Sequence, residues 1–170
     1  MRFYTVISLL VVLISPLAAR DFRPAGLPYT ISLPDRWNQI ETSQIEAIPA
    51  SVKLLVRGEG EYELPPTVNI AVEQVAPTLS TGDYLKSVQA LHSANLMNRC
   101  WQLGPLTGGG EPLELVQVQM ESSWGPVELL QAILVRDGQA CVITASARQE
   151  EFGQQLPIFI QAMQSFKVVK

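Results

Sequence analysis

Residues 127–147 read VELLQAILVRDGQACVITASA, and this stretch decides the fold. Two apolar runs, 127–136 and 139–147, flank the dipeptide Asp137-Gly138. Both positions of this dipeptide accept the positive φ of a type I′ turn, which makes it a strong signal for a two-residue β-hairpin. The sequence therefore predicts two antiparallel strands at these two runs.

Further strand patterns lie outside the hairpin. Residues 29–33 and 67–74 alternate between apolar and polar side chains, which is the period of a half-buried strand. We expect the other strands at 52–57, 101–106 and 113–120. The last two are joined by 107–112, in which Gly108-Gly109-Gly110 allows a turn with positive φ.

Two segments show helical periodicity. The first opens with Ser80-Thr81-Gly82-Asp83, a capping-box pattern in which the serine hydroxyl accepts a hydrogen bond from the first turn, and it runs to about Asn95. The second covers 150–166, where large apolar residues recur at helical steps. Pro157 lies inside it, so we expect a kink or a fresh helix start, because proline removes an amide donor and clashes with the preceding turn.

The N-terminus has the pattern of a secretory signal peptide at residues 1–19. One basic residue precedes an apolar run at 3–14, and small residues end the segment at Ala19. We expect cleavage near Ala19, then a short lead-in at 20–28 and a single domain at 29–170. A periplasmic or secreted location follows from this expectation.

Other relations to a membrane were weighed against cleavage. An uncleaved anchor is the alternative, although Pro16 interrupts the apolar run and about 20 apolar residues are needed to span a bilayer. No cysteine lies near the cleavage region, which excludes a lipid anchor. Peripheral membrane association stays open.

Composition and charge narrow the function classes. A hydrophobic share of 47% with 16% charged residues predicts a compact domain rather than a disordered chain. The formal net charge is -4, and basic residues are scattered from Arg20 to Lys170. Because no cationic stripe is present to neutralise phosphates, we expect no nucleic-acid binding.

Catalytic and transition-metal chemistry have little support. His92 is the one histidine of the chain, so any histidine-dependent site must use it. It shares a helical face with Leu85 and Val88, which favours a packed side chain. No serine lies in a Gly-x-Ser-x-Gly motif, so we expect no enzyme activity.

Three alternating carboxylates form a candidate cation site. Glu59, Glu61 and Glu63 project to one side if their segment is extended, and carboxylate oxygens are the ligands that calcium prefers. The favoured interpretation is a solvated hairpin tip whose charges prevent edge-to-edge pairing.

Trp124 and the two cysteines are the remaining candidates. Trp124 sits in a connection between two strands, where it either anchors a partner protein or folds back over its hairpin. In an oxidising compartment Cys100 and Cys141 either form a disulfide or remain two separately buried thiols. The sequence leaves both questions open.

The order of the elements gives a further indication of the fold. It is carried by the opening stretch 29–37 (YTISLPDRW), the helix from Ser80, the later hairpins and a closing pattern from Phe152 to Phe166-Lys167. Together they resemble the PsbP-like superfamily, which includes bacterial DcrB-like envelope proteins and eukaryotic Ran-binding Mog proteins. The resemblance implies an α+β fold, a mainly antiparallel sheet flanked by helices in an α/β/α sandwich.

The same resemblance implies non-catalytic roles, such as stabilising a photosystem, supporting envelope processes or binding a partner protein. The chain lacks the lipidated cysteine of the DcrB-like lipoproteins and the histidine-carboxylate clusters linked with ion binding in photosystem PsbP. We therefore expect an exported, non-enzymatic accessory protein that binds another envelope protein. The alternative is a periplasmic module that binds a small ligand or a cation.

Overall fold

The fold is described from a computed structural model and covers residues 18–45, 47–60 and 64–169. In chain order the elements are β1 (Ala19–Phe22), β2 (Tyr29–Pro34), β3 (Asn38–Gln39), η1 (Thr42–Gln44), β4 (Val52–Arg57), β5 (Thr67–Gln74), α1 (Thr81–Ser93), β6 (Arg99–Gly108), β7 (Glu111–Ser122), β8 (Gly125–Arg136), β9 (Gln139–Arg148), α2 (Gln149–Ser165) and β10 (Lys167–Val168). Among the described residues, no helix has the length and apolar character needed to cross a membrane.

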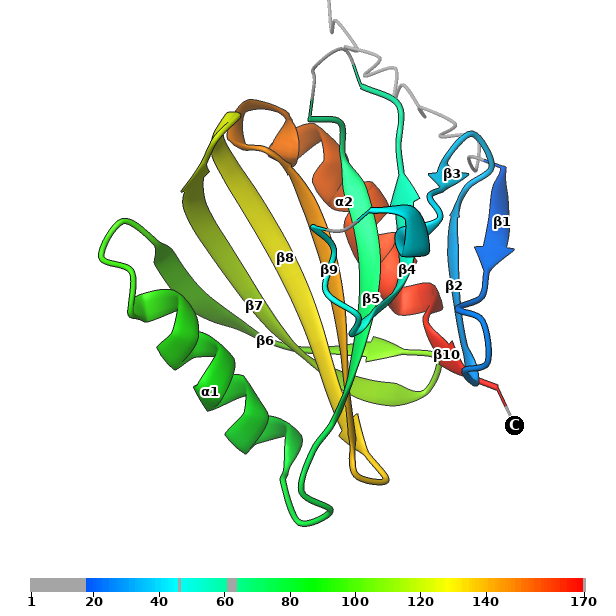
Figure 1. Cartoon of the computed structure of the whole chain (residues 1–170), viewed down its shortest axis with the longest axis vertical. Helices are drawn as coiled ribbons and strands as arrows, with labels where there is room; N and C mark the ends of the chain where they lie inside the picture. Colours follow the sequence, from blue (N-terminus) through cyan, green and yellow to red (C-terminus); the bar gives the residue numbers. More distant parts are fainter. Residues whose placement is uncertain (1–17, 46, 61–63, 170) are drawn as a thin grey trace, which may run out of the picture.

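A seven-stranded antiparallel sheet forms the centre of the molecule, in the order β3-β4-β5-β9-β8-β7-β6 (Figure 1). The predicted hairpin is confirmed as β8 and β9, which pair from Val127↔Arg148 to Arg136↔Gln139. Asp137 and Gly138 have φ values of 52° and 72°, as a type I′ turn requires. The other strands of the sheet lie on both sides of this hairpin.

The two helices cover opposite faces of the sheet (Figure 1). The core on the α2 side takes one set of alternating residues from the central strands, including Leu130 of β8 and Ile143 of β9. The smaller core on the α1 side takes the other set, including Ile133 and Val142 around Leu85. This arrangement confirms the predicted α+β fold with an antiparallel sheet between helices.

Strand β2 belongs to a second sheet, in the order β1-β2-β10. The strand predicted at 29–33 is confirmed as β2, but it is not half-buried, because Thr30 is buried as well as Ile31. On one side β2 pairs with β1 from Ala19↔Pro34 to Phe22↔Ile31, and on the other Thr30 pairs with Lys167 of β10. The strand β1 was not predicted. This strand lies mostly within the predicted lead-in, whose polar sequence gave no strand pattern.

Helix α1 begins as the sequence predicted. The amide of Asp83 donates a hydrogen bond to Oγ of Ser80 at 3.1 Å, and Ser80 is the N-cap residue. Helix α2 runs as one helix from Gln149 to Ser165, so of the two predicted alternatives at Pro157 the fresh helix start is wrong. Phe152 and Phe159 are buried on either side of the proline, and burying each stabilises by about 1.5–3 kcal/mol. Together they offset the roughly 3 kcal/mol that an internal proline costs.

The turn between β6 and β7 touches the end of α2. The amide of Gly109 donates a hydrogen bond to the carbonyl oxygen of Gln164 at 3.2 Å. Gly109 also has a φ of 56°, and a Cβ atom there would clash with the carbonyl oxygen of Phe166. The triglycine is therefore a turn, as predicted. At this turn the sheet lies in close contact with the C-terminal end of α2.

Candidate functional site

The most exposed apolar side chains of the described chain include two that lie in the loop between α1 and β6. Leu96 is 96% exposed and Met97 is 70% exposed. The loop is ordered by Asn95, whose Oδ1 accepts a hydrogen bond from the Met97 amide at 3.0 Å and whose carbonyl oxygen accepts from the Asn98 amide at 2.9 Å. Leu96 and Met97 are therefore exposed on a turn that hydrogen bonds to Asn95 hold in place.

A second ordered turn presents Trp124. It joins β7 to β8, where Ser122 pairs with Gly125 and Gly125 has a φ of 97°. Oγ of Ser122 accepts a hydrogen bond from the Trp124 amide at 3.2 Å and donates one to the Gly125 carbonyl oxygen at 2.8 Å. The indole is 53% exposed, so of the two sequence interpretations the structure shows the outward-facing one.

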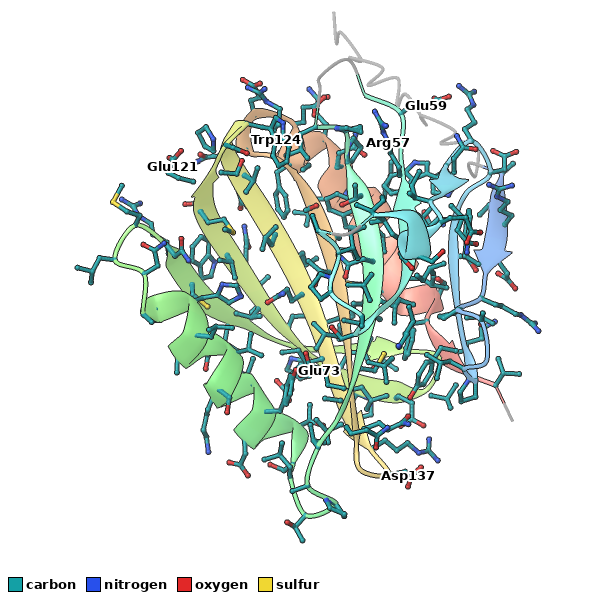
Figure 2. The ribbon with its side chains drawn as sticks, viewed as in Figure 1. Arg57, Glu59, Glu73, Glu121, Trp124 and Asp137 are labelled. Carbon is teal, nitrogen blue, oxygen red and sulfur yellow. The ribbon has the colours of Figure 1, made fainter. Side chains whose placement is uncertain are left out.

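We call Leu91, Leu96, Met97 and Trp124 the apolar tip. Leu91 lies near the end of α1 and is 72% exposed. Figure 2 shows the Trp124 turn and Glu121 at the same end of the sheet, on the side of the α1–β6 loop. Leu91 thus comes from the last turn of α1, Leu96 and Met97 from the α1–β6 loop, and Trp124 from the β7–β8 turn.

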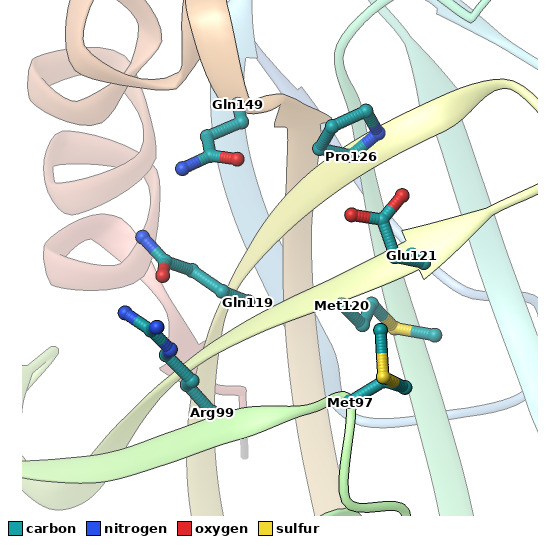
Figure 3. A pocket seen from close by; sticks show the side chains of 7 residues that line it. All are labelled: Met97, Arg99, Gln119, Met120, Glu121, Pro126 and Gln149. Atoms are coloured by element: carbon teal, nitrogen blue, oxygen red, sulfur yellow. The ribbon is translucent and has the colours of Figure 1, made fainter.

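A pocket of about 290 Å³ lies between these two connections (Figure 3). It is lined by Met97, Arg99, Gln119, Met120, Glu121, Pro126 and Gln149. Figure 3 shows the two methionines on one side of the pocket, and Arg99 and Gln119 on the other. The pocket thus joins an apolar wall to a polar one.

Two opposite charges border this pocket. Arg99 and Glu121 are both exposed, and neither forms an ion pair within the described part of the chain. Charged groups at the margin of an apolar area are typical of the polar rim of a protein interface. They are therefore available to a partner.

Behind the pocket lies a buried carboxylate that the sequence did not point to. Glu128 is 6% exposed, and its Oε2 accepts a hydrogen bond from Nε2 of Gln119 at 3.2 Å. Nε2 of Gln117 donates to the other oxygen. Because a buried charge is costly unless it is hydrogen-bonded, these amides stabilise Glu128, and Glu128 in turn fixes Gln119 in the pocket wall.

His92 lies apart from this pocket. Its Nε2 is 3.1 Å from Oε1 of Gln131, and Nε2 of Gln131 donates to Oγ1 of Thr144 at 3.2 Å. Since Oε1 is an acceptor, the histidine donates from Nε2. This hydrogen bond orients the ring against the sheet, and among the described residues no carboxylate or nucleophile is hydrogen-bonded to His92.

The two cysteines are not brought together. Cys100 on β6 and Cys141 on β9 have two strands between them, a separation of about three spacings of ~4.8 Å. They also point into different cores, Cys141 on the α2 side and Cys100 on the α1 side. Disulfides need Cα atoms within about 7 Å, so the disulfide alternative is not realised and both thiols are free. Burial raises the pKa of Cys141 to about 12 and also raises that of Cys100.

The predicted cation site is only partly described. A carboxylate oxygen of Glu59 lies 3.7 Å from a guanidinium nitrogen of Arg36, and both side chains are largely exposed. Glu61 and Glu63 lie outside the described residues. Within the described ranges, no group of three or more histidine, cysteine or acidic side chains is placed to hold a metal ion. The calcium hypothesis stays a prediction.

Of the residues singled out in the sequence, Trp124 alone lies at the apolar tip. The Leu96-Met97 pair carried a signal that was overlooked, because two apolar residues follow directly on the predicted end of a helix, where polar residues are the rule. The pocket residues other than Met97 gave no such signal. They gather only when β6, β7, β8 and α2 are assembled.

The layers and the strand order define an α+β fold that is similar to those of PsbP and Mog proteins. The solution structure of the PsbP protein CyanoP from Synechocystis superposes with a TM-score of 0.62 at 11% identity, over 91% of this chain and 95% of that one. The crystal structure of the Ran-binding protein Mog1p from Saccharomyces cerevisiae gives 0.58 at 15%, over 91% and 97%. LpqN of Mycobacterium tuberculosis, involved in cell envelope biogenesis, gives 0.60 at 11%, over 90% and 91%.

These similarities confirm the fold inferred from the resemblance. No family model matches the sequence, and no curated protein matches it. At identities of 11–15% the likeness shows the arrangement of the chain, while function depends on the residues of the site.

Proposed function

We propose that this chain is an exported, non-enzymatic accessory protein that binds another protein of the cell envelope through the apolar tip. The observation that carries the proposal is the fixed outward position of Leu96, Met97 and Trp124 on two hydrogen-bonded turns. Removing apolar surface from water is worth about 25 cal/mol per Å², so a partner that covers these side chains gains binding energy.

The composition of the tip fits a protein partner. Tryptophan and arginine are enriched among the residues that dominate binding energy, and Trp124 and Arg99 both lie at this end. Because the two turns are already ordered, little conformational entropy is lost when they bind. Arg99 and Glu121 supply a polar rim of both signs.

Compartment and role rest on different observations. The signal-peptide pattern of residues 1–19 supports export. The similar structures support a binding role by analogy: Mog1p is Ran-binding, and LpqN is involved in cell envelope biogenesis. The lone histidine, hydrogen-bonded to Gln131, supports a non-enzymatic role.

The test is crosslinking in the native cell followed by capture of the tagged full-length chain from envelope extracts. We expect one specific partner to be enriched, and Trp124→Ala to reduce that enrichment at least tenfold, as hot-spot tryptophans do. The matched control is Ile45→Ala, which truncates an apolar side chain that is 37% exposed outside the apolar tip. Equal capture by wild type and the Trp124 variant would contradict the proposal.

A further inference from the structure

A groove runs across the sheet next to the start of α2. The pocket of about 290 Å³ beside the apolar tip (Figure 3) shares Pro126 and Gln149 with a second pocket. The second pocket also measures about 290 Å³, and its other lining residues are Arg148 and Glu150. Because two residues line both pockets, the pockets adjoin, and we call them together the polar groove.

The charges that line the polar groove balance one another. Arg99 and Glu121 line the first pocket. Arg148 and Glu150 line the second, where Nε of the arginine lies 2.9 Å from Oε1 of the glutamate. An anionic ligand would face the two glutamates, and a cationic ligand would face the two arginines. Since like charges brought together in a binding site cost affinity, the lining favours a ligand without net charge.

The groove offers hydrogen-bond donors and acceptors together. Nε2 of Gln119 donates to the buried Glu128, which leaves Oε1 of Gln119 as an acceptor. The guanidinium of Arg99 is a donor, the carboxylate of Glu121 is an acceptor, and the amide of Gln149 is both. Within the described ranges, the side chains of these last three residues have no hydrogen-bond partner. A hydroxyl both donates and accepts, so a ligand with several hydroxyls satisfies this set.

The buried carboxylate prepares the groove for a ligand. Glu128 is 6% exposed, and besides Gln119 it accepts a hydrogen bond from Nε2 of Gln117. Fixing a glutamine side chain costs up to about 2 kcal/mol of conformational entropy. Because Glu128 already holds Gln119 in the free protein, a ligand that binds Oε1 of Gln119 avoids most of this cost.

Trp101 adds an apolar surface beside the groove. It pairs with Gln117 as Arg99 pairs with Gln119, so the strand register places these four residues on the same face of the sheet. Trp101 follows Arg99 at about 7 Å along β6. The indole is partly exposed and belongs to neither apolar core of the described chain. Its ring face is therefore available to the flat C–H face of a sugar ring.

We propose that the polar groove and Trp101 together bind a neutral oligosaccharide. The hydroxyls of the sugar form hydrogen bonds with Arg99, Gln119 and Gln149, and the apolar face of one ring packs on the Trp101 indole. Since the groove extends over two pockets, it takes more than one sugar unit. This site goes beyond the proposed function, because it takes a small ligand in addition to the partner protein.

The test follows the indole signals of the full-length chain with nitrogen-15 labelled tryptophan during titration with maltotriose, cellotriose and triacetylchitotriose. We expect at least one of these trisaccharides to shift the Trp101 signal saturably at millimolar concentration. Trp37 is 4% exposed in the α2-side core and serves as the internal control, because its signal should not move. Trp101→Phe and Trp124→Phe assign the signals. A Trp101 signal that none of the three trisaccharides moves overturns the inference.

Arg99→Ala provides the second arm, and its exposed position makes loss of the fold no concern. It should weaken trisaccharide binding about fivefold or more, because hydrogen bonds from charged donors are the stronger ones. The matched control is Arg57→Ala, which removes an exposed arginine of β4 outside both pockets and should change the affinity little. Equal affinity of wild type and Arg99→Ala overturns the inference.

Charged probes test the class of ligand. Trigalacturonate carries negative charge and spermidine carries positive charge, so each meets like charges in the groove and should leave the Trp101 signal in place at concentrations where the trisaccharide shifts it. If either charged probe shifts this signal and the neutral trisaccharides do not, the groove does not bind a neutral oligosaccharide.

Failure of this inference and failure of the proposed function give different results. If Trp124→Ala abolishes partner capture and no trisaccharide moves the Trp101 signal, the apolar tip binds a protein and the groove is not a sugar site. If a trisaccharide shifts the Trp101 signal and Arg99→Ala weakens its binding while Trp124→Ala captures normally, the sugar site stands and the proposed role of the apolar tip is wrong.

Discussion

The hydroxyl of Ser122 is hydrogen-bonded to the amide of Trp124, which donates to it at 3.2 Å. The same hydroxyl donates to the carbonyl oxygen of Gly125 at 2.8 Å. A single side chain thus closes the turn that holds the indole outward. The exposure of Trp124 is therefore a property of the turn rather than of a loose loop. Disturbing Ser122 should affect binding without touching the indole.

Ser122→Ala should weaken partner capture while leaving the fold intact. Removing these two hydrogen bonds should lower the free energy of unfolding by about 1–2 kcal/mol, because each is worth about 0.5–1.5 kcal/mol net. Urea unfolding measures the stability change, and capture from envelope extracts measures binding. Ser123→Ala is the matched control, since it leaves the Ser122 hydroxyl in place and should change both quantities little. If the Ser122 and Ser123 variants have the same stability and the same capture, the Ser122 hydroxyl does not hold the Trp124 turn in place.

Gly109→Ala should destabilise the protein more than Gly110→Ala. Both glycines have positive φ, 56° and 94°, a conformation that costs other residues about 1–2 kcal/mol. A Cβ at Gly110 meets nothing within 4 Å, whereas at Gly109 it clashes with the Phe166 carbonyl at the end of α2. The difference in unfolding free energy between the two variants therefore isolates the contact between sheet and helix. We expect Gly109→Ala to cost at least about 1 kcal/mol more.

The hairpin at Asp137-Gly138 and the Ser80 cap were predicted from the sequence because each depends on a few adjacent residues. Their geometry is local, so the turn φ values and the hydrogen bond to Asp83 follow from residue type alone. Whether α2 continues through Pro157 was left open for the opposite reason. It depends on burial of Phe152 and Phe159, a tertiary effect that overrides local preference.

The candidate site was less accessible to prediction than the fold. Trp124 was singled out because a large aromatic in a short turn is unusual, but its exposure was undecided. The pocket beside Arg99 and Gln119 depends on where β6 starts relative to β7, which only the strand register shows. The burial of Glu128 could not be predicted from the sequence for a similar reason, since its glutamine partners come from the neighbouring strand.

Tyr84 should make the protein lose stability at high pH. Burial raises the pKa of Tyr84 from 10.0 to about 12, and the hydrogen bond to Glu73 at 3.0 Å adds to the effect by favouring the neutral phenol. The unfolded chain therefore ionises first. The stabilisation is fully present below about pH 10 and is lost as the pH rises through about 12.

The variant Tyr84→Phe tests this assignment, because phenylalanine cannot ionise. Urea unfolding at several pH values between 10 and 12 should show a smaller alkaline loss for the variant than for wild type. Some loss should remain, since the pKa of Tyr29 is also raised, chiefly by burial. A variant whose stability falls as steeply as that of wild type would show that Tyr84 does not carry the effect.

The free thiols should react in a fixed order. Thiolates are the reactive form, and burial raises the pKa of Cys141 to about 12 in a site that is 2% exposed. Cys100 is only partly buried, so an alkylating reagent should modify it first, while Cys141 reacts only as the protein unfolds. Mass spectrometry of the native protein with time measures both rates, and Cys100→Ser assigns them. The same variant should keep its stability within about 1 kcal/mol, whereas loss of a disulfide typically costs 2–4 kcal/mol. Equal rates for the two thiols, or a drop of disulfide size, would contradict the separation of Cys100 and Cys141 by β7 and β8.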